Sequence, residues 1–223
     1  MIDKYYNGVI EQVYNHVGTT EKNIVMANYN NDFSIKNLET VKRYRAQMDS
    51  VFFASREFGY RELTGAYEPF LDIICDMFRA YGTGDFDAFL DGCGVYELHK
   101  EILRSYYESG ICKRNENVLL NEVAYEQNRM TEAMTAMLKA LAKEHPLMLV
   151  INRFQMASRS TFELVHDLIA HPDKNIGLVL GVNDSVGRKE SVADMWDSIV
   201  ESLKDRSQLY NIGSSDHRRT EIA

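Results

Sequence analysis

The chain has few of the residues that build disulfide-bonded or zinc-stabilised proteins. Its 223 residues include three cysteines and three prolines. Cys75, Cys93 and Cys112 are an odd number, stand in unlike contexts and form no C-x-x-C pair. Neither a disulfide framework nor a zinc site is therefore expected. Reduced thiols of this kind fit a cytoplasmic protein.

Long apolar runs and excess positive charge are also missing. No apolar stretch approaches the roughly 18 residues of a membrane-spanning helix, and the first four residues, MIDK, are not typical of a signal peptide. A net charge of -8 argues against nucleic acid or an anionic membrane as the main partner. The six histidines show no ligand spacing and no G-x-S-x-G motif occurs, so we predict no metal site and no catalytic residues.

What is present is typical of a globular protein, with 45% apolar and 26% charged residues. Five short apolar runs have the length of buried strands. They lie between helical patterns and are mostly continuous rather than alternating, which predicts a five-stranded parallel sheet with helices on both faces. The predicted strands span residues 24–27, 51–54, 147–151, 175–182 and 209–212.

The spacing of apolar residues predicts helices between these strands. The segment 67–144, between the second and third strands, is too long for one crossover and should form a helical layer or lobe. We predict a single domain over 1–213, a loop over 56–66 and a polar, frayed tail over 214–223. The predicted helices cover residues 5–17, 35–48, 69–81, 117–144, 158–170 and 192–203, with two or three short helices within 86–111.

The loop after the first strand occupies the place where P-loop proteins hold phosphate. It reads ANYNNDFS; Asn28 to Phe33 is predicted to be a turn and Ser34 the N-cap of the next helix. Aligned on this serine, the pattern G-x-x-x-x-G-K-S has Asp32 at its last glycine and Phe33 at its lysine. Phe33 brings no charge to the phosphates, and Asp32 repels them from the helix N-terminus. Taken alone, the loop also fits an ordinary strand–helix connection.

The third strand carries a family resemblance. The stretch 145–169, HPLMLVINRFQMASRSTFELVHDLI, resembles the segment rPlvlvlDDlhwaDpaSlelL of the AAA-like ATPases of the STAND class, found in large bacterial signal-transduction regulators. Residues 66–70, AYEPF, resemble the pYgPf segment of that family, and 175–182 resemble its fourth strand. The similarity covers about residues 3–212. It implies a P-loop-NTPase-like sheet whose first and third strands are neighbours.

The residues that carry the chemistry of this family are replaced. The acidic pair that ends the third strand and holds Mg²⁺ is Asn152 and Arg153 here, and a further acid is Ser158. An asparagine adds no charge and an arginine repels a divalent cation. Asn183 and Asp184 stand where the family has its polar sensor residue. Hydrolysis of ATP depends almost wholly on positioning and charge neutralisation, so these losses predict no turnover.

The resemblance and the losses together imply a catalytically inactive, ATPase-like regulatory or scaffolding module. It would act in the cytoplasm through protein partners, other domains of its parent chain or copies of itself, with no membrane or nucleic-acid contact, as the N-terminal part of a larger bacterial signalling protein. The alternative is a switch that binds ATP, ADP or another anion without turnover. The side chains that would then line the site are Asn28, Asn30, Asn31, Ser34, Asn152 and Asn183.

Two further alternatives stay open at this point. An enzyme of an unrelated class is the third hypothesis, for which no residue constellation argues. Four arginines near the expected cleft could bind an anion or form surface salt bridges. They are Arg43, Arg45, Arg56 and Arg61.

Overall fold

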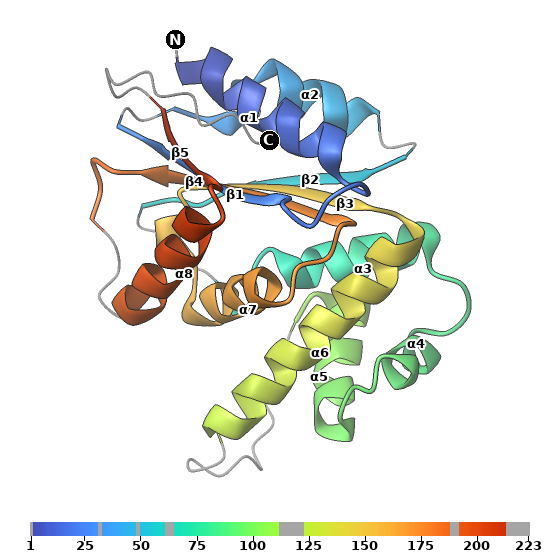
Figure 1. The fold of residues 1–223 in the computed structure, drawn as a ribbon. Helices are drawn as coiled ribbons and strands as arrows, with labels where there is room; N and C mark the ends of the chain where they lie inside the picture. The colour runs from blue at the N-terminus through green and yellow to red at the C-terminus, as the bar shows by residue number, and fades with distance from the viewer. Residues whose placement is uncertain are drawn as a thin grey trace.

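The protein is an α/β structure built on five parallel strands, seen here in a computed structural model (Figure 1). The structure describes residues 2–30, 33–47, 50–60, 65–111, 123–187 and 192–212. The strands lie in the order β2-β3-β4-β1-β5, and every pair is parallel. Their bounds are β1 Ile24–Tyr29, β2 Phe52–Glu57, β3 Leu147–Asn152, β4 Ile176–Asn183 and β5 Leu209–Ile212.

The expectation that the first and third strands are neighbours is wrong. β1 is hydrogen-bonded to β4 and β5, and β4 separates it from β3. The chain passes from β1 to the far edge of the sheet at β2 and then returns through β3 and β4, so β4 takes the place beside β1. With about 4.8 Å between strands, the ends of β1 and β3 lie roughly 10 Å apart.

The strand order decides which face each helix covers. Parallel crossovers are right-handed, so a connection that moves one way across the sheet passes over one face, and the return passes over the other. Only β1→β2 moves toward the β2 edge, and its helix α2 (Glu39–Ala46) therefore lies opposite the later helices. α1 (Ile2–His16) packs beside α2 (Figure 1).

The opposite face carries the returning crossovers and the insertion between β2 and β3. α7 (Arg159–Ala170) and α8 (Ala193–Asp205) cover it together with α3 (Phe70–Tyr81). The insertion continues through α4 (Phe86–Gly92), α5 (Glu97–Ser109) and α6 (Val123–Glu144). α4, α5 and the beginning of α6 extend away from the sheet, forming the expected helical lobe (Figure 1).

Each face of the sheet has its own apolar core because strand side chains alternate between faces. On the α1–α2 face, Val25, Val150 and Val179 pack against residues of α1 and α2, including Ile10 and Val41. The larger core on the other face runs without interruption from β3 and β4 into the insertion. Both β3 and β4 are buried along their whole length, which explains their continuously apolar sequences.

Several predicted boundaries need correction. β1 continues through Asn28 and Tyr29, which were predicted to be turn, and β2 continues to Glu57 through residues predicted to be loop. β2 is an edge strand, where polar side chains are tolerated, so its end does not look apolar. Ser34 caps only a short 3-10 helix, η1 (Ile35–Asn37), and the extended backbone of Leu38 separates it from α2.

The remaining elements match their predicted positions to within a few residues. Ser158 is the N-cap of α7, and the segment 86–111 contains two helices, as expected. Residues 112–122 and the tail 214–223 lie outside the described residues. No helix in the described part of the chain is both long and apolar enough to cross a membrane.

Candidate functional site

The strand order places a topological switch point, which we call the crevice, at the carboxyl ends of β1 and β4. The chain leaves β1 toward the α2 face and leaves β4 toward the α8 face, so the two connections diverge there. In open α/β sheets, ligands bind in such a crevice, outside the carboxyl ends of the strands. This edge also carries the polar residues predicted from the sequence, of which Asn31 lies outside the described residues.

The crevice is bridged by hydrogen bonds between its two loops. The amide of Asp184 donates to the carbonyl of Tyr29 at 2.8 Å, and the Ser185 hydroxyl donates to the carbonyl of Asn30 at 2.5 Å. The side-chain amide of Asn183 is also engaged: its nitrogen donates to the Tyr60 hydroxyl at 2.9 Å, and its oxygen accepts from the Ser185 amide at 3.0 Å. These hydrogen bonds connect the loops that follow β1 and β4 and involve the polar groups predicted to line the site.

A hydrogen bond passes over β4 and joins the strands on either side of it. The hydroxyl of Tyr29 in β1 donates to the side-chain oxygen of Asn152 in β3 at 2.7 Å. Gly181 of β4 makes room, because a Cβ at this position would lie 2.7 Å from that oxygen. The Asn152 nitrogen donates to the Phe33 carbonyl at 3.3 Å. Asn152 is fully buried, and both ends of its amide have protein partners.

Aromatic side chains fill the space beside this bond. Phe33, at the position of the P-loop lysine, makes edge contacts with Tyr29 and Tyr6, at centroid distances of 4.7 and 5.1 Å. Tyr6 is fully buried, its hydroxyl has no hydrogen-bond partner among the described residues, and burial raises its pKa well above the usual value. An apolar side chain therefore packs against the sheet where a phosphate-binding lysine would be expected.

The serine of the loop binds a carboxylate of the protein itself. Glu57, the last residue of β2, accepts hydrogen bonds at Oε2 from the Ser34 hydroxyl and from the Ile35 amide, both at 2.9 Å. Its Oε1 accepts from Nη1 of Arg153 at 3.0 Å. Both side chains of this ion pair are largely enclosed, with 11% of Glu57 and 13% of Arg153 exposed. We call Ser34, Ile35, Glu57 and Arg153 the Glu57 cluster.

Arg153 is fixed in this cluster by its backbone and by further contacts. Its φ of 56° places it in the left-handed region, which is uncommon for arginine and recurs at functional sites. The guanidinium lies over the ring of Tyr60, 4.6 Å from its centroid, and Nη1 donates to the Phe58 carbonyl at 3.2 Å. A positive charge thus stands directly after β3, where the resemblance would lead one to expect an acid.

The helix α2 does not begin directly after Ser34. Ser34 accepts a hydrogen bond from the Lys36 amide and caps only the three residues of η1. α2 begins later, after Leu38, which makes no side-chain cap. In P-loop proteins the phosphate gains from both the loop amides and the helix dipole. Here η1 and Leu38 separate Ser34 from the first turn of α2.

The two remaining predicted residues belong to the end of β1 and to the loop that follows it. Asn28 is directed toward β5, where its side-chain nitrogen donates to the Asn211 side chain at 3.2 Å; its oxygen is buried and meets no partner within the described ranges. Asn30 is exposed. The structure therefore brings Asn152 into contact with the segment 33–35, which contains Ser34. Asn28 instead faces β5, at the edge of the sheet.

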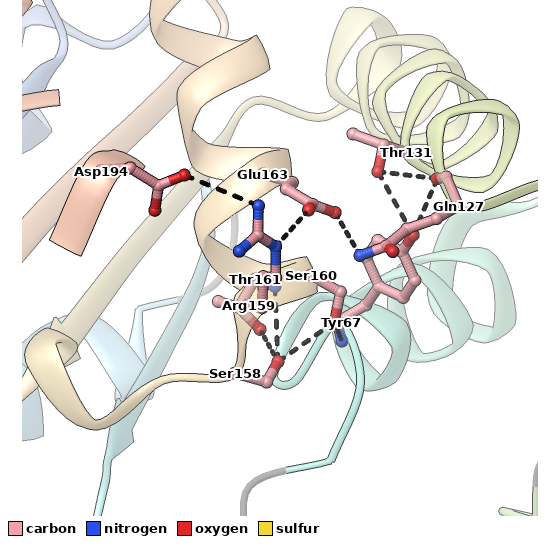
Figure 2. A network of polar contacts seen from close by, with 9 residues as sticks. All are labelled: Tyr67, Gln127, Thr131, Ser158, Arg159, Ser160, Thr161, Glu163 and Asp194. Atoms are coloured by element: carbon pink, nitrogen blue, oxygen red, sulfur yellow. Dashed lines mark hydrogen bonds and ion pairs between the residues drawn. The ribbon is translucent and has the colours of Figure 1, made fainter. Parts of the chain in front are cut away.

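Ser158, at the position of the further acid in the resembling family, has a structural role. Its hydroxyl accepts from the Thr161 amide at 3.3 Å and contacts the hydroxyls of Ser160 and Thr161 (Figure 2). The Ser160 hydroxyl in turn accepts from the amide of Tyr67, just before α3. This network fastens the beginning of α7 to the insertion rather than facing the crevice.

The sequence reasoning missed Glu57, Tyr60 and Gln155. Glu57 and Tyr60 fell in the segment predicted to be loop, although Ser55-Arg56-Glu57 fits the polar end of an edge strand. Gln155 is fully buried after β3 and donates to the Asn183 carbonyl at 3.0 Å, while its side-chain oxygen finds no partner in the described part of the chain. A glutamine within an apolar stretch gives no sequence signal for such a position.

The arginines considered as anion ligands are engaged elsewhere. Arg43 pairs with Glu11 at 2.7 Å, Arg45 donates to Ser55, and Arg56 pairs with Glu68 at 2.5 Å. Arg61 lies outside the described residues. Among the residues that the structure describes, no three His, Cys, Asp or Glu side chains are grouped as metal ligands would be.

Comparison with known proteins assigns no relative to the chain. No protein-family model matches it, and the search of curated proteins found no match.

Proposed function

We propose that this chain is a catalytically inactive, AAA-like domain of the STAND type that works as a regulatory or scaffolding module. The single observation that carries the proposal is the Glu57 cluster. An internal carboxylate takes the donors of Ser34 and Ile35, and Arg153 compensates its charge. A bound triphosphate would have to displace this carboxylate before meeting these two donors.

The surrounding residues support the absence of turnover. Phosphoryl transfer needs a metal that bridges the phosphates and a group that orients the attacking water. At the end of β3 stand the Arg153 guanidinium, paired with Glu57, and the buried side-chain amide of Asn152, whose oxygen and nitrogen both have hydrogen-bond partners. Five parallel strands flanked by helices are compatible with such an ATPase-like sheet, but β1 and β3 are not the neighbours that the resemblance implied, so the proposal rests on these side chains.

The helical lobe supports a role in protein contacts. Arg129 of α6 lies over the rings of Tyr96 and Tyr125, at 5.2 and 4.9 Å, and donates to the Tyr125 hydroxyl at 2.6 Å. Both tyrosines are about half exposed, at 49% and 56%. Tyrosine and arginine are the residue types that dominate binding energy at protein interfaces.

The first test measures nucleotide binding and hydrolysis by the unmodified chain. A ligand at one hundred times its Kd stabilises a protein by about 2.7 kcal/mol, a shift in melting temperature of roughly 5–10 °C at this size. We expect no shift with millimolar Mg-ATP, ADP or GTP and no release of phosphate.

Turnover that is lost in Ser34→Ala or Asn152→Ala, but kept in Glu101→Gln, would overturn the proposal. Glu101 lies exposed on α5 and serves as the control. A melting shift without turnover would instead favour the second candidate, an anion-binding switch. That candidate is supported by the same cluster, because its donors already hold an oxyanion.

A further inference from the structure

We propose that the Glu57 carboxylate is a built-in ligand that closes an oxyanion site, and that a phosphate group occupies this site once the carboxylate is removed or turned away. The site consists of the Arg153 guanidinium, the Ser34 hydroxyl and the Ile35 amide. The inference rests on the proposed function, since it interprets the Glu57 cluster as a closed form of a phosphate site.

The donors of the cluster converge on one anion from three directions. They come from the loop after β1, from the beginning of η1 and from the residue after β3, which is distant from both in the sequence. All three hydrogen bonds to the carboxylate measure 2.9–3.0 Å. A guanidinium, a hydroxyl and a backbone amide are also the groups that bind phosphate oxygens, and arginine is especially suited to doing so.

Arg153 cannot simply follow a departing carboxylate into solvent. Its guanidinium is held over the Tyr60 ring and by the Phe58 carbonyl, and only 13% of the side chain is exposed. Its left-handed backbone conformation further defines where the side chain starts. Without Glu57, the enclosed guanidinium and two donors would face a space of carboxylate size, and removing one partner of a buried ion pair is costly.

The backbone of Glu57 is held in place independently of its side chain. Its backbone is fixed by the parallel register with Asn152, and the next amide, of Phe58, donates to the Asn152 carbonyl at 3.1 Å. Phe58 itself is fully buried. The strand therefore stays in place whichever way the Glu57 carboxylate points, and opening the site needs no rearrangement of the sheet.

The test is a phosphate rescue of Glu57→Ala. This variant should melt below the native chain in chloride buffer, because Arg153 loses the Glu57 carboxylate. Inorganic phosphate at ten times its Kd should then raise its melting temperature by about 3–6 °C at constant ionic strength. The native chain should not respond. Isothermal titration should give a Kd for phosphate at least about tenfold lower for the variant than for the native chain.

Matched variants connect the effect to the site. Glu57→Ala/Arg153→Asn removes the charge with a residue that tolerates the left-handed region, and it should lose the phosphate response. Glu163→Ala removes the nearer of the two carboxylates beside Arg159, and because Arg159 is 52% exposed, this variant should give no response to phosphate. ATP without metal, compared with inorganic phosphate, tells whether the site takes free phosphate or the phosphate of a nucleotide.

The outcomes separate this inference from the proposed function. If Glu57→Ala does not fold, Glu57→Gln keeps the size of the side chain, and its phosphate affinity should still exceed that of the native chain. Variants that fold and ignore phosphate, or that respond equally without Arg153, overturn the inference but leave an inactive domain. Hydrolysis of Mg-ATP by the native chain would overturn the proposed function whatever phosphate does.

Discussion

At the scale of single residues, two buried tyrosine hydroxyls on the same face of the sheet differ in their hydrogen bonding. The Tyr29 hydroxyl donates to Asn152, whereas the Tyr6 hydroxyl, although fully buried, has no partner among the residues that the structure describes. A buried hydroxyl without a partner costs the free energy of its lost hydration, and removing one member of a buried pair leaves the other unsatisfied.

These two residues form a matched pair of substitutions to phenylalanine. Tyr29→Phe should lower the free energy of unfolding by about 1–3 kcal/mol, because it leaves the Asn152 oxygen unpaired. Tyr6→Phe should leave it unchanged or raise it by up to about 1 kcal/mol. Urea unfolding followed by circular dichroism measures both. An equal loss in the two variants would mean that the Tyr6 hydroxyl has a partner in solution.

The predictability of the site also differs from residue to residue. Ser34 as a cap (although only of η1), the missing lysine at Phe33 and the missing acids at Asn152 and Arg153 follow from the sequence, because they are local features of a loop or a strand end. Glu57 does not, since its role depends on β2 lying beside β3 and in register with Asn152. Non-local pairing of this kind leaves no mark on the residues next to Glu57 in the chain.

At the scale of elements, the beginning of α7 joins the sheet to the helical insertion. Glu163 of α7 accepts from the Gln127 side chain of α6 and pairs with Arg159, which also lies 3.7 Å from Asp194 of α8 (Figure 2). Tyr67, before α3, donates to the Gln127 carbonyl at 3.1 Å and contacts the Thr131 hydroxyl. Four parts of the chain are therefore connected through polar groups at one corner.

The buried hydroxyl of Tyr67 at this corner leads us to predict a loss of stability at alkaline pH. Burial, partly offset by the Thr131 hydrogen bond, raises the pKa of Tyr67 to about 12 from its ordinary value of 10. The folded protein thus retains the proton more firmly than the unfolded chain. The stabilisation is complete below pH 10 and is lost as the pH rises from 10 to 12, by on the order of 2 kcal/mol.

The comparison with Tyr67→Phe isolates this contribution. Below pH 10 the native chain should be more stable than the variant by about 1 kcal/mol, from the lost hydrogen bond. Between pH 10 and 12 that advantage should shrink or reverse, because phenylalanine does not ionise. Urea unfolding at several pH values measures it. An advantage that stays constant up to pH 12 would contradict the assignment to Tyr67.

Element positions were predictable where apolar patterns are strong, as in β3, β4, α3 and α7. The residues at which elements end were harder to predict. β2 continues through polar residues because it lies at an edge of the sheet. The helix expected from Ile35 is interrupted at Leu38, whose backbone is extended although leucine is a good helix former. Both misjudged ends border the Glu57 cluster.

At the scale of the whole molecule, the larger core joins the sheet and the insertion into one apolar body. Its members include Leu149 and Leu180 of the sheet, Ile74 and Met77 of α3, and Met137 of α6. Trp196 of α8 packs near Phe154 and Phe162 on the same face. Apolar packing therefore continues from the strands into the helices of the insertion.

Because this core has no boundary between sheet and insertion, we predict one cooperative unfolding transition. Trp196 is the single tryptophan and reports on the sheet side, whereas far-ultraviolet circular dichroism also reports on the helices of the insertion. The two signals should give coincident urea midpoints, as expected for two-state unfolding. A separate, earlier loss of helical signal would show that the insertion unfolds by itself and would contradict a single domain.

The strand order is the feature that sequence patterns could not supply. The number of strands, their parallel direction and the place of the insertion follow from apolar runs and connection lengths. Which strand lies beside β1 depends on how the crossovers pack, and two apolar strands such as β3 and β4 are equally suited to that place. β1 and β3 do not pair as predicted; a side-chain hydrogen bond from Tyr29 to Asn152 connects them across β4.

The position of β1 between β4 and β5 has a consequence for synthesis on the ribosome. Both hydrogen-bonding neighbours of β1 are translated about 150 residues or more after it. At typical elongation rates this corresponds to a delay on the order of 10 s, during which the apolar strand has no partner in its own sheet. The nascent chain is thus exposed to chaperones and to aggregation until β4 and β5 emerge, and it gains its native sheet only late in translation.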